Sequence, residues 1–291
     1  MKVSFRTAED LYPFESRWHE HDGIRMHYVD EGVGRPIVFL HGNPTWSFLY
    51  RDIIKGLRGS FRCIAPDYPG FGRSDRPERG YGFTPREHAE MVGSLVESLE
   101  LHQFIVMGQD WGGPIGMSVA LGDPARVHGL VFANTWYWPA ESLFFRGFSL
   151  FMSTPWMQRA IVKNNFFVER IMPGSVARPM AAEVMDQYRA AQPAPEVRLG
   201  VAVFPREIRK SRPWLAGLAA EAPKRLANKP MLVIWGLKDR AFGSRKDVRE
   251  RWRRDFPNAD VIEINEAGHY IQEDAAAEIV SAIKSRFAAS G

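Results

Sequence analysis

Short runs of aliphatic and β-branched residues recur along the chain, with helix-compatible segments between them. The runs do not alternate with polar residues, which is typical of strands buried on both faces of a parallel sheet. Strands that alternate with helices favour an α/β architecture with helices on both faces of a central sheet. The runs occupy residues 37–40, 104–107, 130–133, 231–234 and 261–264. One earlier segment, 24–29, does alternate, and we expect it to form an antiparallel edge.

A crossover helix is predicted between two of these runs. Thr84 and Glu87 have the spacing of a capping box, and Pro85 occupies the first helical position. Apolar residues then follow at helical spacing, at Val92, Leu95, Val96 and Leu99.

The alternation of strands and helices stops at residue 135 and resumes after residue 214. The intervening segment is rich in Phe, Met, Trp and Arg and is punctuated by prolines. We therefore expect a helical cap domain at 135–214, inserted between two strands of a core domain formed by 1–134 and 215–291. The run 143–152 is apolar enough to suggest membrane contact, but Arg146 interrupts it. A face packed on the core domain is the expectation, with no membrane partner.

Charge and cysteine content restrict the function classes. The chain has 38 basic and 34 acidic residues, spread along its length, which differs from the dense basic patch of a nucleic-acid binder. The basic cluster at 249–254 is interrupted by Glu250 and is expected to be a solvated helix face. The single cysteine, Cys63, cannot form an internal disulfide, and residues 1–18 lack the apolar region of a signal peptide. We expect a cytoplasmic protein that binds no nucleic acid.

Ligands of open parallel sheets bind beyond the carboxyl ends of the strands. Asp110 follows one predicted strand and is flanked by Gly108 and Gly112, and a helix-compatible run comes next. This spacing is that of a nucleophile elbow, with aspartate in place of the usual serine. Small residues are needed on both sides because the turn is too tight for side chains. The alternative is a structural aspartate that caps the next helix.

One of the eight histidines stands out as a candidate base. His269 follows the last predicted strand in a loop, directly after Gly268, and its place late in the chain matches the order nucleophile, acid, histidine of the α/β-hydrolase triad. His19 and His21, with Asp22, have metal-binding side chains, but their spacing offers no third ligand on a rigid element, so no metal is expected.

Two positions are conceivable for the acid of the triad. The first, after the strand at 130–133, carries Asn134, which cannot hold a negative charge and more plausibly supports a loop. The second, after the strand at 231–234, carries Asp239. We therefore expect Asp239 to orient His269 and to stabilise its imidazolium form. The alternative for Asp239 is a loop aspartate in an Asx-turn.

An aspartate nucleophile indicates which kind of substrate carbon is attacked. Serine attack on a saturated carbon would leave a stable ether, whereas a carboxylate leaves an ester whose carbonyl belongs to the enzyme and can be hydrolysed. The sequence therefore predicts two-step displacement at an sp³ carbon, either of an alkyl halide or of an epoxide.

Five stretches of the chain resemble a known family: 41–46, 67–74, 108–113, 235–239 and 268–274. In these stretches the chain resembles the haloalkane dehalogenases of the α/β-hydrolase superfamily. The resemblance implies a hydrolase that releases a primary alcohol, halide and a proton from a haloalkane and water, without a cofactor. It also implies that Asn43 and Trp111 bind the halide through N–H groups and that their backbone N–H groups form the oxyanion hole. Pairing these donors with an Asp-His-Asp triad resembles one subgroup of the family.

Other readings stay open on the residues alone. An epoxide hydrolase shares the aspartate elbow and would protonate the epoxide with cap tyrosines, for which Tyr137 and Tyr188 are candidates. A fluoroacetate dehalogenase would carry an arginine after the nucleophile, where Trp111 stands. The alternative that is not an enzyme is a catalytically inactive protein of this fold that binds a small apolar ligand through its cap. Trp136 and Trp138 at the cap entrance are candidates for a pocket wall or a third donor, but packing is the expectation for both. A homo-oligomer is compatible with these motifs, which do not encode the oligomeric state.

Overall fold

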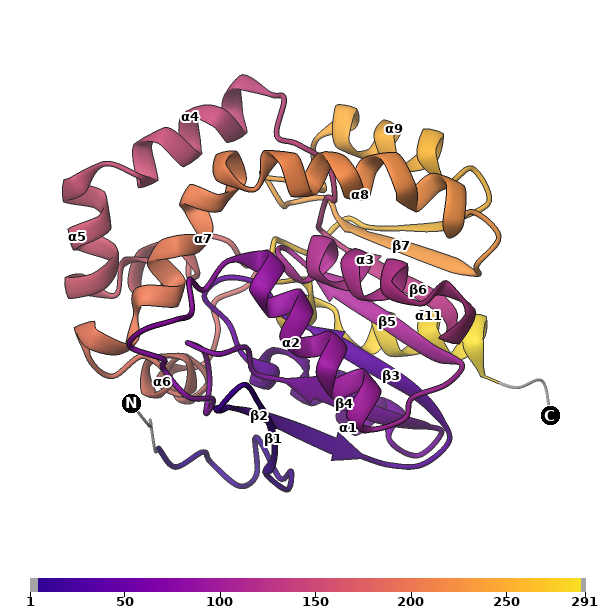
Figure 1. The fold of residues 1–291 in the computed structure, drawn as a ribbon, viewed down its shortest axis with the longest axis horizontal. Helices are drawn as coiled ribbons and strands as arrows, with labels where there is room; N and C mark the ends of the chain where they lie inside the picture. Colours follow the sequence, from indigo (N-terminus) through magenta and orange to yellow (C-terminus); the bar gives the residue numbers. More distant parts are fainter. Residues whose placement is uncertain (1–4, 289–291) are drawn as a thin grey trace.

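A single mixed sheet forms the centre of the computed structural model, which describes residues 5–288 (Figure 1). The strands in this part of the chain have the order β1-β2-β4-β3-β5-β6-β7-β8. The pairs from β4 through β8 are parallel, whereas β2 is antiparallel to both of its neighbours. The strands are β1 (Arg17–His21), β2 (Ile24–Glu31), β3 (Arg35–Leu40), β4 (Phe61–Pro66), β5 (Phe104–Gln109), β6 (Val127–Ala133), β7 (Met231–Gly236) and β8 (Asp260–Ile264).

The predicted strands and the predicted fold class are confirmed. All five unalternating runs lie within β3, β5, β6, β7 and β8. The alternating segment forms β2, which is antiparallel as expected, but β1 pairs with it and is the edge strand. The sequence Arg-Trp-His-Glu-His of β1 is largely exposed, so it lacks the apolar pattern from which a strand can be predicted.

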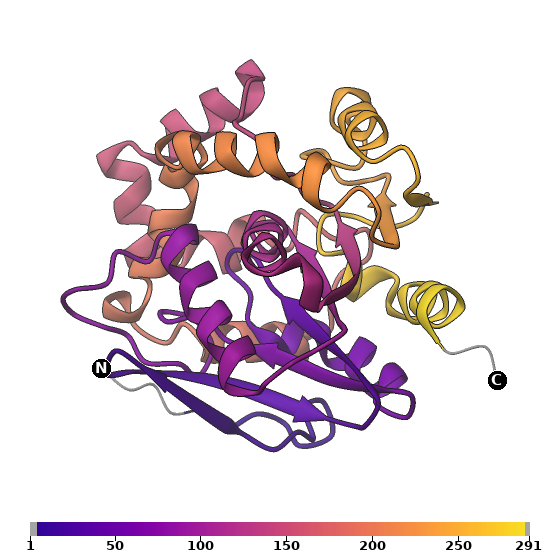
Figure 2. The same cartoon turned by 45° about the vertical axis from the view of Figure 1, so that its right-hand side comes forward.

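Helices cover both faces of the sheet (Figures 1 and 2). Helices α2, α3 and α8 pack together on one face, and α1 packs with α11 on the other. The capping box is present, because the Thr84 hydroxyl accepts from the Glu87 N–H and the Glu87 carboxylate accepts from the Thr84 N–H. The core helices are α1 (Arg51–Leu57), α2 (Pro85–Ser98), α3 (Gly112–Gly122), α8 (Arg212–Arg225), α9 (Lys246–Asp255), α10 (Ile271–Asp274) and α11 (Ala276–Phe287).

A helical segment separates β6 from β7 (Figure 1). Its first long helix, α4, packs against α7, and α5 also contacts α7. The segment contains α4 (Leu143–Met152), α5 (Pro155–Asn164), a π-helical turn η3 (Phe167–Ile171), α6 (Ala182–Ala190), a 3₁₀ turn η4 (Pro195–Val197) and α7 (Leu199–Lys210).

The apolar run that became α4 packs less completely than expected. Its Ser149 and Met152 are buried, but Leu143, Phe144, Leu150 and Phe151 are exposed. Only one side of α4 packs against the rest of the protein. Apolar residues extend around more than that side of the helix, so some of them stay exposed. Within the described residues, no helix is both long and apolar enough to cross a membrane.

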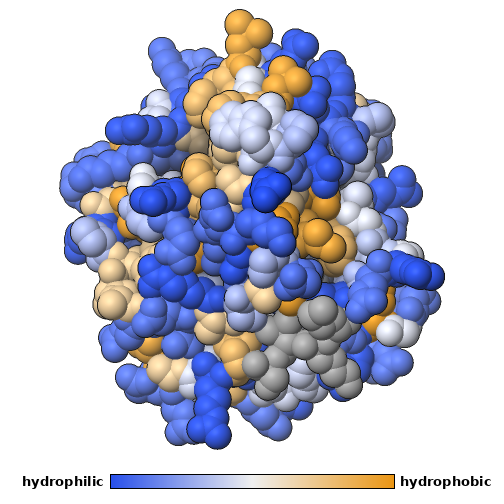
Figure 3. All heavy atoms as spheres, turned by 90° about the vertical axis from the view of Figure 1, so that its left-hand side faces the viewer, coloured by the Kyte–Doolittle hydropathy of each residue, from blue (hydrophilic) through white to orange (hydrophobic). Residues whose placement is uncertain are grey.

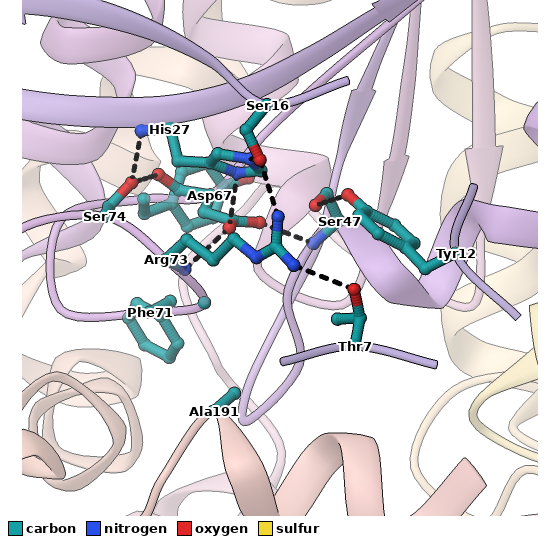
Figure 4. Close-up of polar contacts among 12 residues, drawn as sticks. Thr7, Tyr12, Ser16, His27, Ser47, Asp67, Phe71, Arg73, Ser74 and Ala191 are labelled. Atoms are coloured by element: carbon teal, nitrogen blue, oxygen red, sulfur yellow. Dashed lines mark hydrogen bonds and ion pairs between the residues drawn. The ribbon is translucent and has the colours of Figure 1, made fainter. Parts of the chain in front are cut away.

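A buried polar network holds the edge of the sheet to the loop after β4 (Figure 4). The side chains of His27 on β2 and Asp67 are fully buried, with Nδ1 and Oδ2 2.8 Å apart. On the other side of the imidazole, Nε2 lies 3.1 Å from Ser16 Oγ, which accepts a hydrogen bond from Arg73. Burial would raise the pKa of Asp67, but His27 and the Arg73 backbone N–H outweigh it and lower this pKa to about 2. Since the imidazole is fully enclosed, this network holds β2 to the loop after β4.

Candidate active site

Asp110 lies in a strained turn between β5 and α3. Its φ is +51°, a left-handed conformation that non-glycine residues adopt rarely and that recurs at the nucleophiles of active sites. A Cβ on Gly112 would lie 1.8 Å from the carbonyl oxygen of Leu40, and one on Gly108 would lie 2.3 Å from the Gly112 oxygen. These contacts explain why the elbow needs glycine on both sides. The Asp110 side chain does not cap α3, whose N-cap is Trp111 and has no side-chain cap bond.

The structure brings the three predicted triad side chains together. His269 Nε2 lies 3.6 Å from Asp110 Oδ2, and His269 Nδ1 lies 3.0 Å from Asp239 Oδ2. The other carboxylate oxygen of Asp239 accepts from the Ala241 N–H at 2.7 Å, so the residue makes the local turn contact and also contacts the histidine. Asp239 is 2% exposed, so its carboxylate is shielded from solvent while it contacts the imidazole.

Asn134 and Gln109 hold the loop that carries His269. The Asn134 amide donates to the carbonyl oxygens of Gly268 at 2.7 Å and His269 at 3.2 Å, and it accepts from the Gly236 N–H at 2.9 Å. The Gln109 amide donates to the His269 carbonyl oxygen at 3.0 Å. Sequence reasoning gave Asn134 a loop-supporting place but missed Gln109, whose position beside the nucleophile was the one available signal.

Asn43 and Trp111 flank the Asp110 carboxylate. The Asn43 backbone N–H donates to Asp110 Oδ1 at 2.9 Å, and its side-chain amide donates to the Val201 carbonyl oxygen at 3.3 Å. The indole of Trp111 is 2% exposed and stacks on Phe204, with ring centroids 5.4 Å apart. Both residues line the same cavity as Asp110. One of the two N–H groups of the Asn43 amide thus binds α7, and the other is available to the cavity.

The cavity has a volume of about 270 Å³ and is lined mainly by aromatic and aliphatic side chains. Trp136 is one of them: its ring meets that of Trp111 edge to face at 4.8 Å and stacks on Phe242 at 5.1 Å. Sequence reasoning did not identify the residues that the helices between β6 and β7 contribute, because an amphipathic helix carries no local signal for which side faces a ligand. These residues are Phe144, Phe145, Phe148, Phe167, Ile171, Pro205 and Ile208.

Burial and charge act in opposite directions on the two titratable groups at the centre. Burial raises the pKa of Asp110, opposed by the charge of His269 and by the backbone N–H groups of Asn43 and Trp111. Burial disfavours the charged form of His269, but the charge and hydrogen bond of Asp239, together with Asp110, outweigh it and raise this pKa. The arrangement therefore favours an imidazole that accepts a proton readily.

No metal centre is found in the part of the chain that the structure describes, where no three His, Cys, Asp or Glu side chains are grouped to hold an ion. The candidate residues of the amino-terminal segment have other contacts. His19 lies 2.8 Å from Ser94 Oγ, and His21 lies 3.6 Å from the exposed Asp22.

Comparisons with known proteins identify the family. A family model described as the alpha/beta hydrolase fold matches residues 35–276. Haloalkane dehalogenase 2 of Mycobacterium tuberculosis is 50% identical over 99% of this chain and 100% of its own length. A cis-3-alkyl-4-alkyloxetan-2-one decarboxylase of Shewanella oneidensis is 32% identical over 95% of this chain and 89% of its own. The crystal structure of a haloalkane dehalogenase from Bradyrhizobium elkani has a TM-score of 0.84 at 27% identity, covering 94% of this chain and 97% of that one. The chain therefore belongs to the haloalkane dehalogenases of the α/β-hydrolase fold.

Proposed function

We propose that this enzyme hydrolyses carbon–halogen bonds in small haloalkanes through an ester formed on Asp110. The observation that carries the proposal is a carboxylate held in a strained elbow at the wall of an apolar cavity, with His269 Nε2 3.6 Å away. An apolar cavity suits a haloalkane, whose only polar group is the bond that breaks.

In the first step, Asp110 Oδ2 attacks the carbon that bears the halogen. A carbon–oxygen bond forms as the carbon–halogen bond breaks, and the halide leaves with the electron pair of that bond. The indole N–H of Trp111 and the free amide N–H of Asn43 stabilise the charge that develops on the halide. Neither donor carries a negative charge of its own, and their stabilisation grows as the bond breaks, which lowers the barrier.

In the second step, His269 Nε2 takes a proton from water, and the resulting hydroxide attacks the ester carbonyl of Asp110. The imidazolium that forms is stabilised by Asp239, whose Oδ2 lies 3.0 Å from Nδ1. The backbone N–H groups of Asn43 and Trp111 stabilise the tetrahedral oxyanion, each contributing about 3 kcal/mol. The tetrahedral intermediate then collapses, and the bond between the Asp110 carbonyl carbon and the alkoxide oxygen breaks. The alkoxide takes up the proton of the new carboxyl group and leaves as the alcohol, which restores the Asp110 carboxylate, and the His269 imidazolium releases its proton to the solvent.

The domain division that we propose is a cap at 135–214 and a core at 1–134 and 215–291. It is supported by the contacts of α4 and α5 with α7, and by the packing of α8 against α3. The proposed boundary between residues 214 and 215 falls within the first turn of α8, which begins at Arg212. We also propose a cytoplasmic location, which the single cysteine, Cys63, supports because the fold needs no disulfide.

The environment of the cap tyrosines favours this activity over epoxide hydrolysis. Tyr137 donates to Asp255 at 2.6 Å, and Tyr188 donates to Glu273. Neither tyrosine lines the cavity of Asp110. Tyr270 does line it, but its hydroxyl donates to the Asn43 carbonyl oxygen at 3.1 Å. No pair of tyrosines in the described residues therefore stands ready to protonate an epoxide oxygen.

The test is bromide release from 1-bromobutane or 1,2-dibromoethane, with acidification of the medium. Styrene oxide and a cis-3,4-dialkyl-oxetan-2-one serve as rival substrates, the second because of the decarboxylase relative. Turnover of either rival without bromide release from the haloalkanes would overturn the proposal.

A variant tests the covalent step directly. His269→Phe lacks the base for the second step, so the butyl ester of Asp110 is expected to accumulate and to be detected by mass spectrometry. The matched control is the double variant that also carries Asp110→Asn, which has no nucleophile and is expected to gain no mass. Absence of the adduct in a folded His269→Phe variant that binds 1-bromobutane contradicts the covalent scheme.

A further inference from the structure

The outward side of α4 and the start of α5 carries large apolar side chains that the fold leaves in contact with solvent. Leu143 is 83% exposed, Leu150 53%, Phe151 49% and Trp156 58%. The rings of Phe151 and Trp156 contact each other edge to face at 5.0 Å, so the two helices form one continuous apolar surface. We call these four residues the outer cap face. Figure 3, which looks at the side of the molecule where α4 and α5 lie in Figure 1, shows hydrophobic side chains protruding at the top of this side.

The charges that accompany the outer cap face have a single sign. On α4, Arg146 stands three residues after Leu143 and four before Leu150, which places it on the same side of the helix. On α5, Arg159 and Lys163 follow Trp156 at the same helical spacing, and all three are exposed. Residues 142–168 contain these three basic side chains and no acidic one.

None of these basic side chains forms an ion pair with another described residue. The ion pairs found in residues 5–288 involve neither Arg146, Arg159 nor Lys163. The nearest acidic neighbours in sequence are Glu141 and Glu169, of which Glu169 binds Arg189 at 2.9 Å. No ion pair within residues 5–288 therefore neutralises these three basic side chains, and the exposed Glu141 is the one acidic residue close to them in sequence.

The same helix separates the outer cap face from the candidate active site. Phe145 and Phe148 on α4 line the cavity that holds Asp110, while Leu143 and Leu150 face solvent. A globular protein gains no packing energy from apolar residues exposed in this way, and exposed apolar patches commonly mark interaction sites. Because only one helix lies between them, a partner on the outer cap face would lie beside the cavity.

We propose that the outer cap face docks on an anionic lipid surface, with its apolar side chains in the acyl boundary and its basic side chains at the headgroups. Leu, Phe and Trp with only Lys and Arg as charges are the composition of helices that lie in a membrane interface. Here the basic residues share the side of the apolar ones, so their long side chains would extend from the apolar surface to the headgroups. Attraction between the unpaired basic residues and anionic headgroups adds to the burial of apolar surface.

A second copy of the chain fits this surface less well. A symmetric dimer brings the same patch of both copies together, so Arg146, Arg159 and Lys163 of one copy would approach those of the other. No acidic side chain of residues 142–168 is available to compensate. Like charges that face each other across an interface are costly, whereas anionic headgroups supply the opposite charge.

Docking would place the cavity beside the phase in which apolar haloalkanes concentrate. This consequence rests on the proposed function, but the docking itself does not. A lipid-dissolved substrate would then need no passage through water before it meets α4.

The experiment is co-sedimentation of the full chain with vesicles of equal parts phosphatidylcholine and phosphatidylglycerol, compared with pure phosphatidylcholine. We expect binding to the anionic vesicles that weakens as salt is added. The variant Leu150→Ser with Phe151→Ser is expected to bind about tenfold more weakly, since two apolar side chains no longer leave water. The control is Val33→Ser, which also replaces an exposed apolar side chain by serine but lies between β2 and β3, away from the outer cap face.

A second variant tests the charge. Arg146→Ser with Arg159→Ser leaves the apolar residues in place and is expected to remove the preference for phosphatidylglycerol. If the variant with Leu150→Ser and Phe151→Ser does not fold, this arginine variant tests the proposal by itself. Wild-type protein that stays in the supernatant, or both variants binding like wild type, overturns it. A dimer by light scattering that the serine pair dissociates, with no vesicle binding, assigns the surface to a second copy instead.

These outcomes are separable from the proposed function. Leu150, Phe151, Arg146 and Arg159 do not line the cavity, so turnover of 1-bromobutane dissolved in buffer is expected to be unchanged in both variants. Loss of vesicle binding with full turnover would leave the enzyme activity intact, and full vesicle binding without any turnover in wild type would leave the docking intact.

Discussion

Asn134→Ala is expected to weaken both the fold and the catalytic step, because one amide joins the two loops of the site. The side chain is fully buried and makes hydrogen bonds with Gly236, Gly268 and His269. Its removal leaves the Gly236 N–H and the Gly268 carbonyl oxygen without this partner. The His269 carbonyl oxygen keeps the amide of Gln109 at 3.0 Å.

The size of the effect follows from these two orphaned groups. A buried polar group that loses its partner costs about 1–3 kcal/mol, so the free energy of unfolding should fall by roughly 4 kcal/mol. At about 2 °C per kcal/mol for a large domain, the Tm should fall by roughly 8 °C. Since Gly236 precedes the Asp239 loop and Gly268 precedes His269, the geometry of the second chemical step should loosen as well, and kcat should fall more than KM changes.

Thermal unfolding followed by circular dichroism measures the stability, and steady-state bromide release measures kcat and KM. Asn134→Asp is the matched control. One carboxylate oxygen can still accept from the Gly236 N–H, but the other oxygen takes the place of the amide nitrogen that donates to the Gly268 carbonyl oxygen. Burial beside carbonyl oxygens raises the pKa of this new carboxyl above its unfolded value, and its protonated form again donates. The stability of this variant should therefore be highest at low pH and be lost as pH rises through the raised pKa. A Tm within 2 °C of wild type and an unchanged kcat for Asn134→Ala would refute the reasoning.

Three further outcomes are expected. Trp111→Phe keeps the ring but removes the indole N–H, and single-turnover measurements should show bromide release slowed on the order of a hundredfold; an unchanged rate would exclude this donor. Gly112→Ala places a Cβ 1.8 Å from a backbone oxygen of β3 and should prevent folding as judged by circular dichroism, whereas Gly122→Ala, with no atom within 4 Å of its added Cβ, should fold normally. The hydrolysis rate of the ester should rise with pH through the raised pKa of His269, because only the neutral imidazole accepts a proton. In Asp239→Asn this pH profile should move to lower pH, since the charge that raises the pKa is gone; an unmoved midpoint would contradict the coupling.

The sheet and the elbow could be predicted because their signals are local. Buried parallel strands are apolar along their whole length, and a turn that excludes a Cβ at Gly112 requires glycine whatever the rest of the fold does. The edge strand β1 was missed for the same reason: its exposed residues carry no apolar pattern. The position of Asp239 after the penultimate strand could be inferred because parallel strands deliver their carboxyl ends to one edge.

The sequence by itself therefore determined the α/β-hydrolase fold, the family and the residues that meet at the strand ends around Asp110. Only the tertiary structure decided what lies around them. Gln109 contacts His269 across 160 residues of chain, and Trp136 joins the cavity wall through rings contributed by other elements. The side of α4 that faces Asp110 and the side that stays in solvent also follow from how the helix packs on α7. Such contacts depend on the relative placement of distant segments, and amphipathic periodicity specifies that a helix has two sides without specifying what each side meets.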